Sequence, residues 1–117
     1  MLEGLWVAKF VAPNVPGMEL NGGVVVIESG RLLGGDSGYV YIGQLQPAQS
    51  GWAISMKIVR HDPSIISVFG DLDEYLLSGV AVKAHDQAGA EALLVQLSMA
   101  GMPIQLTVEL KKVAELP

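Results

Sequence analysis

The chain has no cysteine, few aromatic residues, few charges and no long hydrophobic run. The lack of cysteine among its 117 residues excludes disulfides and thiol chemistry. The seven Lys and Arg residues are scattered, which argues against direct binding of nucleic acid. No apolar run approaches the ~20 residues of a membrane-spanning helix, so no membrane partner is expected. The start of the chain lacks the pattern of a signal peptide, and the sequence therefore predicts a cytoplasmic protein.

What the chain does have is hydrophobic material. Half of its residues are hydrophobic and only 16% are charged, with a net charge of −5. This length and composition predict one domain, residues 1–117, with a single core. Apolar surface in excess of what a core needs often marks a partner interface or a cavity.

Residues 24–43 show the pattern that most of the chain follows. Residues 24–27 are all β-branched, and residues 39–42 form a second run that favours a strand. Turn formers occupy residues 28–30 and 34–38. Within the second group, Asp36 is expected to accept hydrogen bonds from its own backbone. The segment predicts β-hairpins.

The same reasoning along the chain predicts an all-β fold. Strands are expected over residues 2–12, 18–28, 31–33, 37–46, 52–60, 74–84, 91–99 and 104–113. A pair of glycines, Gly22 and Gly23, indicates a bulge in the second strand. Asp62 and Pro63 predict one short helical turn in the 61–73 connection. About eight sequential antiparallel strands favour an up-and-down barrel or a flattened version of one.

One strand is apolar on both of its faces. Tyr39 and Tyr41 share one face, while Val40 and Ile42 share the other. In a barrel, the outer face of such a strand needs a cover as well as the inner face. We therefore predict a homodimer and assign these four residues to its interface.

The barrel interior is the other candidate site. Eight strands enclose a space that side chains fill or that holds one small ligand. The residues expected to line it are Trp6, Phe10, Trp52, Met56 and Met99. The same side chains are equally suited to fill the core, so the sequence leaves both alternatives open.

Residues with chemistry of their own are few. The pairs His61-Asp62 and His85-Asp86 lie in expected loops, where solvated turn residues are the simpler interpretation than a metal or catalytic site. The sequence accordingly predicts no catalytic residue, no metal ligand and no cofactor. A small acidic cluster is either a solvated loop or a docking site for a basic partner. Its members are Asp71, Asp73 and Glu74.

The start of the first strand resembles a feature of the lipocalins and their calycin relatives. Gly4, Leu5 and Trp6 form a Gly-x-Trp sequence. In those proteins the tryptophan closes one end of the barrel, and an arginine from the last strand lies over it. The corresponding strand of this chain offers Lys111 and Lys112.

Taken over most of its length, the chain also resembles the GrlR-like family of negative regulators of type III secretion. The matching features are Gly4 with Trp6, then Gly30, Gly34-Gly35-Asp36, Tyr41 and Gly43, then Pro63-Ser64 with residues 73–77, and finally Gly101-Met102-Pro103. The resemblance implies a lipocalin-like barrel, a homodimer, and regulation by capture of a transcriptional activator.

The resemblance does not extend to one loop. The characterised branch of that family carries acidic residues after its Tyr-x-Gly strand, whereas residues 47–50 of this chain are Pro, Ala, Gln and Ser. We therefore expect a non-enzymatic regulatory or protein-interaction module, with binding of a small apolar ligand in the barrel as the alternative.

Overall fold

A computed structural model of the chain describes residues 2–11, 19–67, 69–85, 89, 91–103 and 105–117. The described residues form eight strands and no helix. The strands are β1 (Gly4–Val11), β2 (Glu19–Glu28), β3 (Arg31–Gly35), β4 (Tyr39–Ala48), β5 (Gly51–Arg60), β6 (Glu74–His85), β7 (Glu91–Ser98) and β8 (Gln105–Ala114). Each prediction of a strand is confirmed, with small differences at the ends. Nothing in the described part of the chain is a helix able to cross a membrane.

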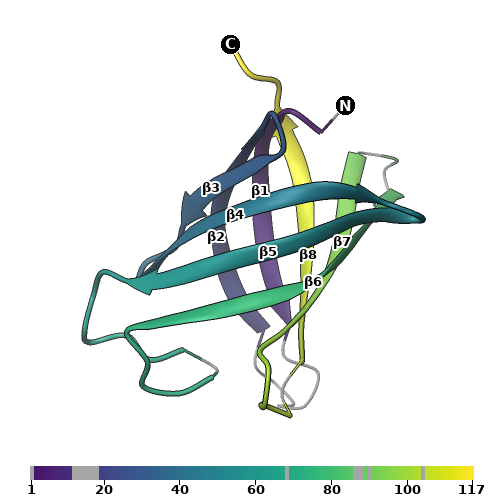
Figure 1. The fold of residues 1–117 in the computed structure, drawn as a ribbon. Coiled ribbons are helices and arrows are strands. Elements are labelled where there is room, and N and C mark those ends of the chain that lie inside the picture. Colours follow the sequence, from purple (N-terminus) through teal and green to yellow (C-terminus); the bar gives the residue numbers. More distant parts are fainter. Residues whose placement is uncertain (1, 12–18, 68, 86–88, 90, 104) are drawn as a thin grey trace.

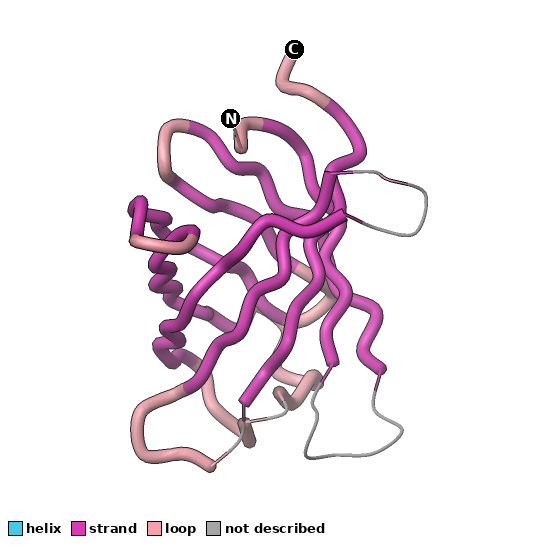
Figure 2. The backbone as a smooth tube through the Cα atoms, turned by 90° about the vertical axis from the view of Figure 1, so that its right-hand side faces the viewer, coloured by secondary structure: helices cyan, strands magenta, loops and turns pink. Residues whose placement is uncertain are grey.

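The strands form one closed antiparallel barrel. Each strand pairs with the next in the sequence, and β8 pairs with β1 to complete the ring (Figures 1 and 2). Closure leaves no free sheet edge that could pair with another chain. The predicted up-and-down barrel is therefore confirmed. Both described termini lie at the same end of the barrel as the turn between β2 and β3 (Figure 1).

The alternation of side chains along each strand places the core inside the ring. Trp6 and Leu93 are completely buried, and the buried residues form a single cluster within the barrel. On β5, Ile54, Met56 and Ile58 point inward as their period of two predicts. Burial of these side chains is the main stabilising contribution that the sequence supplies.

The turn between β2 and β3 follows from two residues. Ser29 and Gly30 have φ values of 54° and 76°. Two successive residues with positive φ make the turn whose twist matches a hairpin, and glycine adopts this conformation without steric cost. The predicted turn is confirmed here.

The second predicted turn is shorter than expected, because Gly34 and Gly35 belong to β3. Gly34 pairs with Val25 on one side and Tyr41 on the other. A Cβ atom at Gly34 would collide with the backbone of Val24. These glycines therefore serve close strand packing, and the turn itself begins at Asp36. Asp36 Oδ1 accepts hydrogen bonds from the amides of Gly38 and Tyr39, at 2.9 and 2.8 Å.

The bulge predicted at Gly22 and Gly23 is present. Val7 pairs with Val24, while Lys9 pairs with Asn21, so that two glycines of β2 lie opposite Ala8 alone. Such an extra residue bends the strand and increases its twist, which helps a small sheet to close.

The connection from β5 to β6, residues 61–73, contains no helix among its described residues. The expected helical turn is instead a single β-turn, in which the amide of Ile65 donates to the carbonyl of Asp62. The Asp62 carboxylate accepts hydrogen bonds from both the amide and the hydroxyl of Ser64. These bonds satisfy the first turn locally, and the chain then continues into a bridge between Ser67 and Gly70. We call residues 61–67 and 69–73 the strap.

Candidate functional site

The predicted lining of the barrel is divided between its two ends. Trp6 closes one end, where its indole N–H donates to the carbonyl of Leu2 at 3.0 Å. Lys112 Nζ lies 5.9 Å from the centre of the Trp6 ring. A lysine from β8 thus takes the position over the tryptophan that the calycin pattern gives to arginine. Trp52 is only half-buried and lies with Leu2, Ile27 and Leu45 around an open hollow of about 370 Å³ at this end of the barrel.

The middle of the barrel is filled. Two internal voids bordered by Phe10 and Met56 are found in the described part of the barrel, with volumes of about 70 and 20 Å³. Met99 is partly buried and packs against the core. Pockets that enclose small organic ligands usually have volumes of about 300 to 1,000 Å³. The lining residues therefore act here mainly as core.

The larger void lies at the end opposite Trp6, next to a carboxylate. Asp36 and the aromatic side chains of Phe10, Tyr39, Tyr41 and Tyr75 line it, together with aliphatic residues. The Tyr41 hydroxyl donates a short hydrogen bond to Asp36 Oδ2. The Phe10 and Tyr41 rings meet edge to face, with centres 5.9 Å apart. We call this end of the barrel, with its turn at residues 36–38, the mouth.

The strap lies over the mouth. Phe69 is buried, and its ring centre is 5.5 Å from that of Tyr75. The Tyr39 hydroxyl donates to the carbonyl of Leu72 at 3.1 Å. These contacts join the strap to the aromatic rings of the barrel wall.

A single arginine holds the two ends of the strap. Arg60 donates to the carbonyl of Ile65 at 3.0 Å, and it forms ion pairs of 2.7 and 2.5 Å with Asp71 and Asp73. The hydrogen bonds that Arg60 donates to these carboxylates raise the pKa of its guanidinium. Glu74, the third member of the predicted acidic cluster, lies 3.8 Å from Lys57. The cluster therefore serves the fold, while its exposed carboxylates leave docking of a basic partner as a prediction.

The predicted interface strand, β4, divides between the inside and the outside of the barrel. Tyr39 and Tyr41 are each only 4% exposed and point inward, so assigning these two side chains to an interface was wrong. Because side chains alternate between the two faces of a strand, Val40 and Ile42 are the two of these four residues that point outward. Ile42 is 48% exposed.

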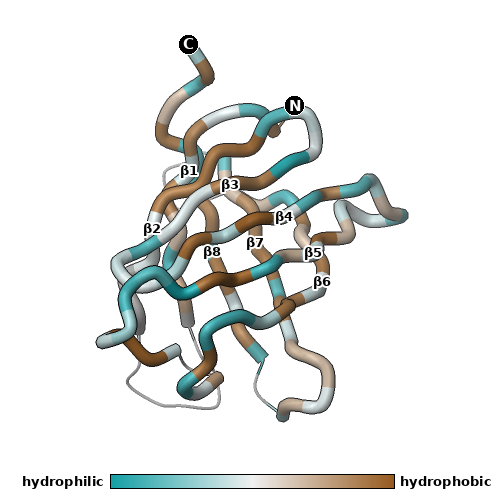
Figure 3. Tube along the Cα trace, turned by 60° about the vertical axis from the view of Figure 1, so that its left-hand side comes forward, coloured by the Kyte–Doolittle hydropathy of each residue, from teal (hydrophilic) through white to brown (hydrophobic). Residues whose placement is uncertain are grey.

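Ile42 belongs to a larger apolar surface that the sequence did not reveal. Strand pairing sets Leu5, Val26, Leu33 and Ile42 side by side in one row across β1 to β4. A second row, two residues along the strands, contains Val7, Val24 and Val40. Hydrophobic residues recur along these strands in Figure 3. We call these seven residues the aliphatic face.

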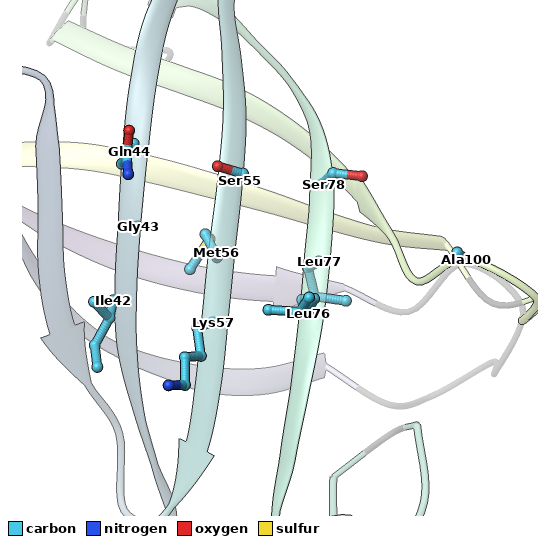
Figure 4. Close-up of a pocket in the computed structure, with 10 residues that line it drawn as sticks. All are labelled: Ile42, Gly43, Gln44, Ser55, Met56, Lys57, Leu76, Leu77, Ser78 and Ala100. Atoms are coloured by element: carbon cyan, nitrogen blue, oxygen red, sulfur yellow. The ribbon is translucent and has the colours of Figure 1, made fainter.

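The first row continues beyond β4 and borders a hollow on the outside of the barrel. Lys57 lies opposite Ile42, and Leu76 lies opposite Lys57. Gln44, Ser55 and Ser78 form the next row, and their smaller or more flexible side chains leave a hollow of about 590 Å³ (Figure 4). This outer hollow is larger than either internal void.

The two His-Asp pairs do not form a site in the described residues. His61 Nε2 lies 3.0 Å from the backbone carbonyl oxygen of Asp36, and Asp62 caps the turn that begins the strap. His85 ends β6, and Asp86 lies outside the described residues. No three His, Asp or Glu side chains gather as a possible metal site within the described ranges.

Burial of the phenols at the mouth predicts a measurable pH dependence. Burial raises the pKa of Tyr75 to about 12, and burial together with the bond to Asp36 raises the pKa of Tyr41 as well. The folded state thus keeps these protons at pH values where the unfolded chain, with a tyrosine pKa of about 10, loses them. Their contribution to stability is present below about pH 10 and is lost as the pH rises through the folded values.

The measurement is the ultraviolet absorbance of tyrosinate during a pH titration. At about pH 11 the folded protein, which has three tyrosines, is expected to show at most one ionised. The Tyr75→Phe variant is expected to lose one of the two ionisations with a raised pKa and to keep that of Tyr41. Ionisation of all three tyrosines with a midpoint near 10 would contradict the burial described here.

Sequence reasoning missed the contacts between segments that lie far apart. The Arg60 clamp joins β5 to both ends of the strap, and nothing in the local sequence marks it. The sequence gives a weak indication of the hydrogen bond between Asp36 and Tyr41, since a polar turn residue can contact a tyrosine of the strand that follows it.

No protein-family model matches the chain, and no curated protein matches it in sequence. The function is therefore argued from the geometry above and from the resemblance of its motifs.

Proposed function

We propose that the protein is a non-enzymatic interaction module that acts through the aliphatic face as a cytoplasmic homodimer. The observation that carries this proposal is the contrast between a filled interior and an exposed apolar exterior. Leu33 and Ile42, at the centre of the face, are 53% and 48% exposed. The absence of cysteine is compatible with the cytoplasm.

The size of the aliphatic face supports this proposal. Neighbouring strands lie about 4.8 Å apart, so four strands and two rows span about 15 by 7 Å between Cβ positions. With the side chains included, this area is comparable to the largest apolar patches of soluble monomers, which are often functional. Polar residues such as Glu28 and Arg31 border it, as in the polar rim of an interface.

The regulatory role follows from the resemblance to the GrlR-like family. It implies that the dimer holds a transcriptional activator away from its promoter. We propose a protein partner of this class, held by surface contacts. A small apolar ligand in the middle of the barrel is not proposed, because it would need a void of a few hundred Å³ and the voids there are about 70 and 20 Å³.

Oligomeric state is the direct test, with one variant on the aliphatic face and one matched control. Leu33→Glu places a charge at the centre of the face, whereas Val80→Glu places the same charge on β6, at an equally exposed position of 53%. Two copies of a buried glutamate facing each other are expected to weaken the dimer by at least about tenfold. Native mass spectrometry should find dimers of the wild type and of Val80→Glu, and monomers of Leu33→Glu.

A wild type that remains monomeric at tens of micromolar would contradict the homodimer. A Leu33→Glu protein that dimerises as the wild type does would remove the aliphatic face from the interface. The activator is then sought by pulling down partners with the wild type and with Leu33→Glu. Loss of the same promoter-binding protein from the variant supports capture at this face, and equal recovery opposes it.

A further inference from the structure

A second site is present at the mouth, independent of the aliphatic face. Four aromatic side chains and one carboxylate border the void of about 70 Å³. The Tyr39 and Tyr75 rings lie edge to face with centres 5.9 Å apart, and Phe10 meets Tyr41 at the same distance. Aromatic walls around a carboxylate are the surroundings that organic cations prefer, because the ring faces and the carboxylate are both negative.

At this void, the side chains of Asp36, Tyr39 and Tyr41 have acceptor positions left over but no free donor. A carboxylate has about four acceptor positions, and Asp36 uses three of them, for Gly38, Tyr39 and Tyr41. The hydroxyls of Tyr41 and Tyr39 donate their protons to Asp36 and to the carbonyl of Leu72, respectively. Their oxygens therefore remain able only to accept. A primary ammonium offers three donors and no acceptor, which complements this set.

The charges around the mouth have the matching sign. Asp36, Asp62, Asp71 and Asp73 lie on the turn and the strap, together with one guanidinium, that of Arg60. His61, the other basic side chain there, contacts the backbone carbonyl of Asp36. Such an excess of carboxylates attracts cations to an opening and repels anions.

The volume limits the ligand to a small head group. One water occupies about 30 Å³ in the liquid, so the void has room for about two or three heavy atoms. An ammonium nitrogen and its first carbons fill such a space, while the rest of an alkyl chain extends toward solvent. Asp36 is partly exposed, so the site can be reached past the turn.

We propose that the mouth binds a primary ammonium group carried on an alkyl chain, with Asp36 as its counter-charge and the surrounding tyrosines as its walls. Both a free alkylamine and the side chain of a lysine in a protein segment present this chemistry. Binding of an amine at the mouth requires neither the homodimer nor the regulatory role.

The first test titrates the full chain with three probes of equal chain length. Nuclear magnetic resonance follows the amides of Gly38 and Tyr39, which bond to Asp36. Pentylammonium is expected to shift both signals to saturation. Pentan-1-ol, which has no charge, is expected to bind at least tenfold more weakly, and pentanoate is expected to cause no saturable shift. Equal binding of pentan-1-ol, or no saturation by pentylammonium, would overturn the proposal.

Variants locate the site. Asp36→Asn keeps the shape and removes the charge, and it is expected to weaken pentylammonium binding at least tenfold. Glu28→Gln removes the same charge at an exposed position at the other end of the barrel and is expected to bind as the wild type does. Should Asp36→Asn fail to fold, Tyr75→Leu removes one ring and leaves the carboxylate, with an expected loss of about threefold or more. Wild-type affinity in Asp36→Asn or Tyr75→Leu would place the amine elsewhere.

A last comparison separates the two sources of the amine. A pentapeptide of glycines with one central lysine is titrated beside pentylammonium. Tighter binding of the peptide assigns the site to a lysine side chain of a partner, and tighter binding of pentylammonium assigns it to a free amine. The control peptide has norleucine in place of lysine. Equal binding of both peptides would overturn recognition of the ammonium.

Discussion

Replacing Tyr41 with aspartate is expected to lower the free energy of unfolding by several kcal/mol, which is much of the stability of a domain of this size. The Tyr41 side chain is 4% exposed, packs edge to face on Phe10 and donates its hydroxyl to Asp36. The variant loses this packing and sets a second carboxylate against that of Asp36. Two like charges in a partly buried site destabilise the folded state unless one is protonated. Urea unfolding followed by circular dichroism measures the loss.

Two control variants separate the causes. Tyr41→Phe keeps the ring and removes only the hydrogen bond to a charged acceptor, an effect of about 1.5 to 3 kcal/mol. Gln44→Asp introduces the same charge on β4, at an exposed position on the outer side of the barrel and outside the aliphatic face. A substitution at an exposed position typically changes the free energy of unfolding by about 0.5 kcal/mol or less. A Tyr41→Asp protein as stable as Gln44→Asp would show that the inward direction of Tyr41 is incorrect.

Two neighbouring residues of β4 show what the sequence could predict. Tyr41 and Ile42 are both apolar, and their alternation correctly separated them onto opposite faces of β4. Which face points into the barrel depends on the curvature of the closed sheet. Because both faces of this strand are apolar, its pattern alone does not decide. Strands with one polar face, such as β5 with Ser55 and Lys57 outside, presented no such ambiguity.

The fold was largely predictable because its signals are local. The strands are five to twelve residues long, and turns such as the one at Ser29 and Gly30 are fixed by the residues within them. The prediction of a helical turn at Asp62 was wrong, because aspartate before proline begins a β-turn as readily as a helix.

The candidate sites were less predictable because they arise from closure. The aliphatic face is assembled from β1 to β4, and only the register shows that Val26, Leu33 and Ile42 lie side by side. The mouth combines the turn at Asp36 with Phe10 of β1 and Tyr75 of β6. The acidic cluster at Asp71 and Asp73 was visible in the sequence, but its basic partner, Arg60, was not.

The closed end of the barrel gives the second large expected effect. Trp6→Ala is expected to lower the free energy of unfolding by about 3 to 5 kcal/mol, since it leaves a cavity where a large side chain was completely buried. The variant also leaves the carbonyl of Leu2 without the indole donor, and Lys112 without the ring over which its ammonium lies. Urea unfolding at neutral pH measures the change.

Trp52→Ala is the matched control, because these two residues are the only tryptophans of the chain. Trp52 is half-buried beside a hollow that is open to solvent, where the loss of a side chain lets water enter instead of leaving an empty space. Trp52→Ala is therefore expected to lower the free energy of unfolding by less than half as much as Trp6→Ala does. The Trp52→Phe variant should retain the blue-shifted fluorescence of an indole shielded from water. Equal losses for the two alanine variants would contradict the role of Trp6 as the side chain that closes this end of the barrel.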